Sequence, residues 1–451
     1  MRSKLLVLGV GVVASLACSS PEANDDPGPV TTGGTGATSG GSSGAPTGGT
    51  GGAGRGGTGG AGRGGTGGAA GIGIAATGGV GGAGRSGSAG GGGASGGASG
   101  SANGATAGVA GGAGTGPSGG GAGGSEITLS PTPGTYRQTC DGSLGVVIDA
   151  DHFLDGNDEN QGLRIYRRGA DAAPVATVDV STSIGLTASD EADLEDAARI
   201  GNRIYVVSSH GRDKDGNLER ERYRFFGLDI SGTVPNVSLT GAGFSSTLLD
   251  QMLVAANWTT PNPAVIATLN AAANLGEPED SDLAPKADGT SIEALAWAPT
   301  ATRPSQLLVG FRNPTQSADA IVVSLLNADA VLAGATASFG EATLLDLGGL
   351  GLRAMAYSPL HAAVLVIAGP TADDGPFRLF RWSGLPSTAP VAIRDVTNAP
   401  ADASAEAIVV YPNTRDVQIL FDEGDHLVGG TACKDAAASS RSFSDVIVHV
   451  P

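Results

Sequence analysis

The chain has 451 residues and a formal net charge of −18. All of its Phe, Tyr and Trp residues lie beyond residue 126, so the preceding part cannot bury enough apolar surface to offset its ordering entropy. The acidic excess also lies beyond residue 126, where it repels a phosphate backbone and attracts cations. We therefore exclude nucleic acid as a partner. The acidity serves solubility or, as the alternative, the binding of a cation.

Residues 1–18 have the pattern of an export signal. Two basic residues precede the apolar run Leu5–Leu16, which is too short to span a bilayer as a helix. The run ends in Ser15-Leu16-Ala17-Cys18, which resembles the bacterial lipobox with Leu one position closer to the Cys than usual. This resemblance implies that Cys18 is lipidated and anchors the exported protein to a membrane, with Ser19 indicating the outer membrane or the cell surface. Ordinary cleavage near Ala17, which would leave Cys18 as a free thiol, is the alternative.

Residues 19–125 are dominated by Gly, Ala, Ser and Thr. This composition predicts a disordered linker, whose r.m.s. span as a Gly-rich coil is roughly 50–60 Å. One folded domain is expected from residue 126 to residue 451, because the apolar and aromatic residues needed for a core begin there.

The domain reads as short β-strand runs broken by Gly, Asp, Asn and Pro. One pattern, an apolar or small residue followed by a charged residue and then small apolar residues, recurs with its charge at Glu195, Glu293, Arg353 and Glu406. A second strand run follows each copy, at 203–207, 306–310, 363–367 and 417–421, and an uncharged relative of the pattern begins at Leu144. This spacing predicts an all-β domain, a β-propeller of five blades, with a sixth blade or an irregular β-sandwich as alternatives. A short helical insertion is expected over 246–275.

The repeat also predicts where polar side chains gather. The first two strands of a blade form an antiparallel hairpin, so the start of the first strand lies beside the end of the second. The four repeated charges stand at first-strand starts, and further polar residues stand at second-strand ends: Asp158, Glu159, Asn160, His210, Arg212, Arg312, Asn313, Asp422 and Glu423. We expect all of them on one face, around the mouth of the central channel.

Two chemistries suit such a face. Carboxylates with an Asn and a His favour Ca²⁺, or a metal-activated water or general base, with Glu293, Glu406, Glu195 and His210 as catalytic candidates. Alternatively the Glu residues pair with arginines and order the blade loops. We therefore expect a surface-tethered protein that binds or recognises a ligand, with a metal-dependent hydrolase of a phosphate ester or lactone as the alternative.

Cys140 and Cys433 stand near the two ends of the folded domain. In an exported protein their pairing is the default, and closure of a propeller brings its first and last blades together. We therefore expect a Cys140–Cys433 disulfide.

Several stretches resemble a family of exported bacterial proteins classed only as a domain of unknown function, over about 140–451. The matching stretches are 158–160 with 163–166, 207–212, 308–314, 346–353, 367–370 and 381–384. Family members usually read Glu-Gly where this chain has Glu195-Asp196, Glu293-Ala294 and Glu406-Ala407. The resemblance implies a β-propeller-like fold and supplies no known activity. More distantly, the domain is similar in fold to propeller hydrolases of the phytase-like and lactonase kind.

Overall fold

The computed structural model describes residues 133–286, 288–397 and 403–451. Within these ranges the chain forms five four-stranded antiparallel sheets and one two-stranded hairpin. The inner strands of successive sheets contact one another in a closed ring, so the domain is a five-bladed β-propeller, as predicted. The expected leader, 1–18, and linker, 19–125, lie outside the described residues.

Four blades take their strands from continuous stretches of chain, ordered from the inner strand outward. Blade 1 contains β2 (Leu144–Val147), β3 (His152–Gly156), β4 (Gly162–Arg167) and β5 (Ala176–Asp179). Blade 2 contains β6 (Leu194–Ile200), β7 (Arg203–Ser208), β8 (Phe225–Thr233) and β9 (Asn236–Ser245). Blade 3 contains β10 (Ser291–Trp297), β11 (Leu307–Gln316), β12 (Asp319–Leu325) and β13 (Phe339–Leu345). Blade 4 contains β14 (Gly351–Ser358), β15 (Ala363–Gly369), β16 (Arg378–Trp382) and β17 (Val391–Asp395).

Blade 5 joins the two ends of the domain. Its inner strands are β18 (Ser404–Val410), β19 (Asp416–Asp422) and β22 (Ser442–His449), and its outermost strand is the short N-terminal β1 (Thr135–Arg137). The Tyr136 hydroxyl donates to Asp445 Oδ2 at 2.7 Å and accepts from Gln418 Nε2 at 2.8 Å, so buried polar groups hold β1 against the blade. The hairpin of β20 (Leu427–Val428) and β21 (Thr431–Ala432) lies between β19 and β22 in the sequence.

The predicted disulfide is confirmed. Cys140 and Cys433 are bonded, with their Cα atoms 5.8 Å apart and both side chains buried. Cys140 follows β1, and Cys433 follows the β20–β21 hairpin, so the bridge lies at the seam where the ring closes.

The core is divided among the blade interfaces. Each of five clusters of buried apolar side chains fills the space between two neighbouring blades, and the cluster between blades 5 and 1 is rich in aromatic residues. Because a middle strand packs on both faces, β15 is buried along its whole length and reads as a continuous apolar run. The central strands therefore form rigid walls around the channel.

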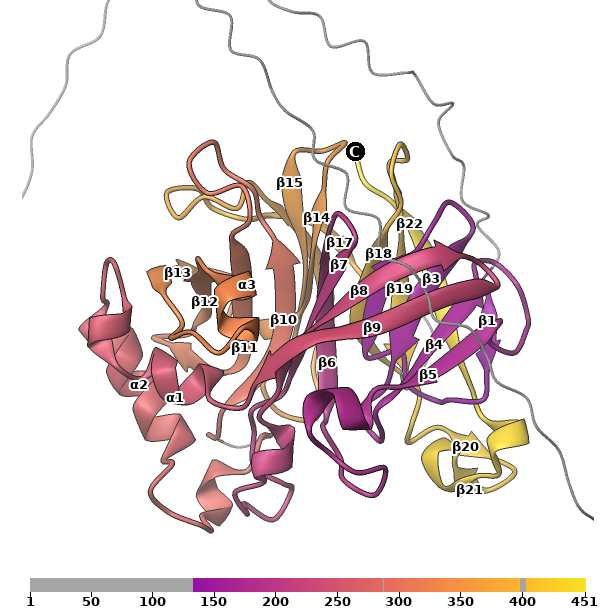
Figure 1. Ribbon diagram of the computed structural model, residues 1–451, viewed down its shortest axis with the longest axis horizontal. Coiled ribbons are helices and arrows are strands. Elements are labelled where there is room, and N and C mark those ends of the chain that lie inside the picture. Colours follow the sequence, from indigo (N-terminus) through magenta and orange to yellow (C-terminus); the bar gives the residue numbers. More distant parts are fainter. Residues whose placement is uncertain (1–132, 287, 398–402) are drawn as a thin grey trace, which may run out of the picture. The chain divides into compact units, whose positions relative to one another are not determined.

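The expected helical insertion lies between blades 2 and 3. It contains α1 (Leu248–Met252) and α2 (Pro263–Ala273), and α2 packs against β11 beside blade 3 (Figure 1). Asn262 caps α2 by accepting the backbone N–H groups of Ala264 and Val265. A further short helix, α3 (Ala328–Leu332), was not predicted. Among the described residues, none of the helices has the length and apolar character needed to cross a membrane.

Candidate functional site at the channel mouth

The repeated charges occupy β-bulges. In four inner strands the pairing with the next strand skips one residue: Glu195 in β6, Glu293 in β10, Arg353 in β14 and Glu406 in β18. A bulged residue is unpaired in the ladder, and its side chain can be re-aimed. The pairing of β2 with β3 in blade 1 is continuous, and this is the blade whose inner strand has no such charge. The sequence repeat is thus a repeat of bulges.

Three of the four bulged side chains are joined by ion pairs across blades 3, 4 and 5. Glu293 Oε2 lies 2.9 Å from Arg353 Nη1, and the other amino group of Arg353 contacts Glu406. Glu293 Oε1 accepts from Arg312 Nη1 at 3.1 Å and from the Ser291 hydroxyl at 2.8 Å. All three bulged residues and Arg312 are at least nine-tenths buried. The arginine pairing that the sequence left as an alternative is therefore present in this chain of ion pairs.

The neighbouring arginine side chains determine the protonation state of Glu293. Burial raises the pKa of its carboxyl group, but the Arg353 and Arg312 guanidinium groups lower it by more, so the pKa lies below its ordinary value. Glu293 is therefore ionised at neutral pH, and it holds two cationic side chains in fixed positions. Arg353 also lies over the Phe377 ring, with its guanidinium carbon 5.8 Å from the ring centroid.

Asp196, which the sequence reasoning did not select, links three blades below the ion pairs. Its carboxylate accepts the backbone N–H groups of Ala197 at 2.8 Å, Leu295 at 2.7 Å and Met355 at 3.1 Å. Leu295 and Met355 each stand two residues after a bulge, in β10 and β14. The sequence signal that could have identified Asp196 is its place beside Glu195, where the family pattern has Gly.

A second group of acids lies toward blades 5, 1 and 2. Burial raises the pKa of Asp141, and the charges of Asp158 and Asp422 raise it further. Burial likewise raises the pKa of Asp158, with Asp422 and Asp193 adding to the effect. Burial and the charges of Glu293, Asp193 and Asp158 raise the pKa of Glu195. Negative charge within the group of Asp141, Asp158, Glu195 and Asp422, the mouth acids hereafter, thus disfavours ionisation of the first three.

No cationic group within the described ranges approaches any of the mouth acids to within 4.0 Å. Arg222 pairs instead with Asp193 at 3.0 Å, and Lys434 pairs with Asp425 at 2.9 Å. One carboxylate oxygen of Asp158 is buried and has no hydrogen-bond partner in the described structure. The mouth therefore has a neutralised half around Arg353 and an acidic half around Asp158.

His210 and Arg212 have positions of their own. The His210 ring is fully buried against Tyr223, with Nδ1 2.8 Å from the Ser208 carbonyl oxygen, and burial lowers its pKa to about 4. Arg212 donates at 2.9 Å to the carbonyl oxygens of Gly216, in the loop after β7, and of Asn274 and Glu277, beyond the end of α2. Both side chains make their contacts in blade 2 and its insertion. The expectation that they join the ring of charges is wrong, because the reversed backbone at His210, with φ of +50°, follows β7 into a buried loop.

The remaining predicted residues order the loops of the mouth. Asn313 donates to the carbonyl oxygens of Pro285 at 2.7 Å and Thr371 at 2.8 Å, and Arg312 also donates to loop carbonyls after β15. Glu423 accepts the N–H of Ser444 at 3.0 Å.

Asn160 and Glu159 lie in the turn between β3 and β4. The Asn160 side chain accepts the N–H of Gly162 at 2.9 Å, which stabilises the turn, whereas Glu159 is exposed. As for the expected Ca²⁺, among the described residues no group of three or more His, Cys, Asp and Glu side chains is placed to hold a metal ion.

Residues 250–421 match the family described as Protein of unknown function (DUF3616). The DUF3616 match covers β10 to β19 and includes Glu293, Arg312, Arg353 and Glu406, so it contains the whole chain of ion pairs. Of the stretches that resembled a family of unknown function, those from residue 308 onward lie inside the match, and those at 158–166 and 207–212 lie outside it. No curated protein matches the chain.

Solved structures similar to the chain have low sequence identity. A putative oxidoreductase (glucose dehydrogenase) from Thermus thermophilus is 10% identical, with 69% of this chain and 97% of that chain covered and a TM-score of 0.35. A mitotic checkpoint complex chain is 11% identical, with 67% and 74% covered and a TM-score of 0.30. The β-propeller domain of Cps50 (Swd1) from Myceliophteria thermophila is 8% identical, with 68% and 84% covered and a TM-score of 0.27.

Proposed function

We propose that this protein is a recognition module whose propeller binds a positively charged ligand at the acidic half of its channel mouth. The observation that carries the proposal is the set of mouth acids: neighbouring negative charges raise the pKa of Asp141, Asp158 and Glu195, and none of the four carboxyl groups has a cation within 4.0 Å among the described residues. An ammonium or guanidinium group placed between them would relieve this repulsion and gain charge-assisted hydrogen bonds.

The neutralised half supports the same function. Buried ion pairs fix Glu293, Arg353 and Glu406, so the floor of the mouth is preorganised and needs no ligand charge to complete it. Binding of a ligand then costs little conformational entropy in the protein. The charge of the ligand interacts with the mouth acids. The net charge of −18 on the chain adds electrostatic steering of cations.

The test uses the full chain with tri-lysine, spermidine and tri-glutamate as probes in isothermal titration calorimetry. We expect tri-lysine and spermidine to bind more weakly as salt is raised, and tri-glutamate not to bind. Glu195→Gln removes one mouth acid and should weaken tri-lysine binding by roughly fivefold to tenfold, about 1 kcal/mol. Glu341→Gln, at an exposed site in β13, is the control and should leave binding unchanged. Equal binding by tri-glutamate, or no effect of Glu195→Gln, would contradict the proposal.

The alternative of a metal-dependent hydrolase has weaker support. Of its four candidate residues, Glu293 and Glu406 are held by arginines, and His210 is enclosed in blade 2. Glu195 is the one carboxylate among the four that has no ion-pair partner within the described ranges. No specific observation at the site favours hydrolysis over binding.

We also propose that the propeller is displayed from a membrane through lipidated Cys18, because the apolar run before Cys18 resembles a lipoprotein signal and a polar, Gly-rich segment follows. The wild-type protein should fractionate with membranes and partition into detergent, and Cys18→Ser should release it or block its processing. A wild-type protein that stays wholly in the soluble fraction would contradict lipid anchoring. Cys18→Ser should bind ligand as the wild type does.

A further inference from the structure

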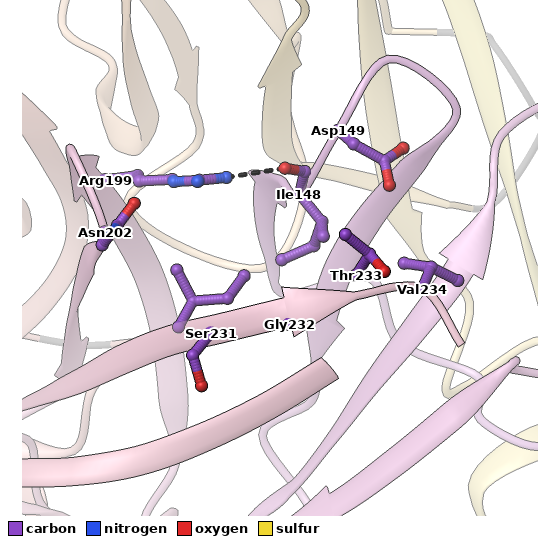
Figure 2. Close-up of a pocket in the computed structure, with 9 residues that line it drawn as sticks. Ile148, Asp149, Arg199, Asn202, Ser231, Gly232, Thr233 and Val234 are labelled. Carbon is purple, nitrogen blue, oxygen red and sulfur yellow. Dashed lines mark hydrogen bonds between the residues drawn. The ribbon is translucent and has the colours of Figure 1, made fainter. Parts of the chain in front are cut away.

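A cleft of about 450 Å³ lies between blades 1 and 2, away from the mouth. Its walls are the turn after β2, the turn between β6 and β7, and the tip of the β8–β9 hairpin (Figure 2). In β6, Glu195 stands at the mouth, whereas Arg199 stands four residues farther along, roughly 13 Å at the rise of an extended strand. The cleft is therefore at the opposite end of the blades and separate from the site described above.

Arg199 is the charged anchor of this cleft. Its Nη1 donates to the carbonyl oxygens of Val147 and Ile148, both at 2.8 Å, and its Nε donates to Gly201 at 2.8 Å; Figure 2 shows the bond to Ile148. These bonds fix the guanidinium plane, while no hydrogen bond of Nη2 occurs to any residue that the structure describes. Within those same ranges no carboxylate lies within 4.0 Å of Arg199. Arg199 is thus a half-buried cation that is held rigidly, and its Nη2 group can still donate hydrogen bonds to an anion.

The rest of the cleft limits the ligand's size and charge. Ile148, Ile230 and Val234 provide apolar surface, and Thr233 adds a hydroxyl group. Figure 2 labels Ile148, Thr233 and Val234 along the cleft. The volume lies in the range of sites that enclose small molecules. Asp149, at the edge, already accepts from the Asp151 N–H at 2.8 Å and the His152 ring at 2.9 Å, and its negative charge disfavours a second anionic group on the ligand.

From these contacts we infer that the cleft binds a small monocarboxylate with an apolar body. The carboxylate would accept from Arg199 Nη2, and the apolar body would cover Ile148, Ile230 and Val234. The guanidinium suits a carboxylate better than a neutral amide, because a hydrogen bond from Nη2 to a carboxylate oxygen also joins opposite charges. This second site does not depend on the proposed function of the mouth.

The experiment titrates benzoate, benzamide and benzylamine into the full chain and follows binding by NMR and calorimetry. Benzoate should saturate one site and bind at least roughly tenfold more tightly than benzamide, while benzylamine should show no binding at the cleft. Tri-lysine bound at the mouth should not displace benzoate. Failure of benzoate to saturate, or equal affinity for benzamide, would overturn the inference.

Two variants locate the benzoate site. Arg199→Met should abolish benzoate binding, but it also removes the bonds to Val147 and Ile148 and can lower stability. Thr233→Trp fills the cleft without removing any side-chain hydrogen bond within the described structure, and it should weaken benzoate by more than tenfold with an unchanged melting temperature. Val391→Trp, at an exposed position of β17, is the matched control and should bind benzoate as the wild type does. Unchanged affinity in Thr233→Trp would place benzoate elsewhere and refute the site.

Discussion

Replacing Glu293 with Gln tests the chain of ion pairs at the mouth. The substitution preserves shape but leaves Arg312 and Arg353, which lie 3.1 and 2.9 Å from the Glu293 oxygens, without that negative charge. Removing one partner of a buried ion pair costs about 3–5 kcal/mol, a large part of the roughly 5–15 kcal/mol that stabilises a typical domain. We expect a loss of this size in the free energy of unfolding, measured by urea denaturation at pH 7 with circular dichroism.

The wild type should also lose the contribution of Glu293 in acid. The pKa of Glu293 is lowered in the folded state, so its stabilisation is complete above the unfolded value near 4.5 and disappears as the pH falls through the lower folded pKa. Glu293→Gln should therefore have a flatter stability profile below about pH 5. Asp171→Asn, which breaks an exposed ion pair with Arg137, is the control and should cost less than about 1 kcal/mol.

Two results would refute this reasoning. If Glu293→Gln lowers the free energy of unfolding by less than about 1 kcal/mol, the negative charge of Glu293 is not required to stabilise the buried arginines. A chelator that lowers the melting temperature of the wild type but not of Glu293→Gln would mean that a cation, and not an arginine pair, neutralises this residue.

Three further outcomes are expected. Replacing Cys140 and Cys433 with Ser should lower the unfolding free energy by about 3–5 kcal/mol, because the bridge spans 293 residues, and no free thiol should be detected in the mature folded domain of the wild type. Asp196→Ala should lower it by about 3 kcal/mol or more in urea denaturation, since three buried N–H groups lose their acceptor, and Asp196→Asn should cost less. Burial lowers the pKa of His210 to about 4, so wild-type stability should fall by about 3 kcal/mol as the pH drops from 6.5 to 4; His210→Leu should remove that slope, and an unchanged slope would contradict the burial.

The blade repeat could be predicted because each copy keeps a charge at one position among small apolar residues. A charge is costly at a buried position, so its recurrence at Glu195, Glu293, Arg353 and Glu406 indicated equivalent places in successive blades. The structure shows that this place is a bulge. The pairing of Cys140 with Cys433 followed from closure of the ring, which depends only on the order of the blades.

Other features depend on contacts between distant segments. β1 has three residues and no apolar alternation, so pairing with β22 and the Tyr136 network create it. The direction of His210 depends on a left-handed backbone angle after β7. Asp196 accepts hydrogen bonds from the N–H groups of two other blades, and Arg199 lies in a cleft formed partly by the β8–β9 hairpin. The residue pattern within one stretch of sequence predicts neither contact, because the partners come from other stretches.

The seam of the ring also determines how tension on the protein would be carried. A pull on the chain from its N-terminal side loads β1 first, where the three residue pairs with β22 and the buried hydrogen bonds of Tyr136 resist it. After β1 has peeled away, the load reaches Cys140, and the disulfide transfers it covalently to Cys433 instead of to the inner strand of blade 1. β1 can thus detach without opening the ring of inner strands. The disulfide then carries the load and protects the channel from being opened by force.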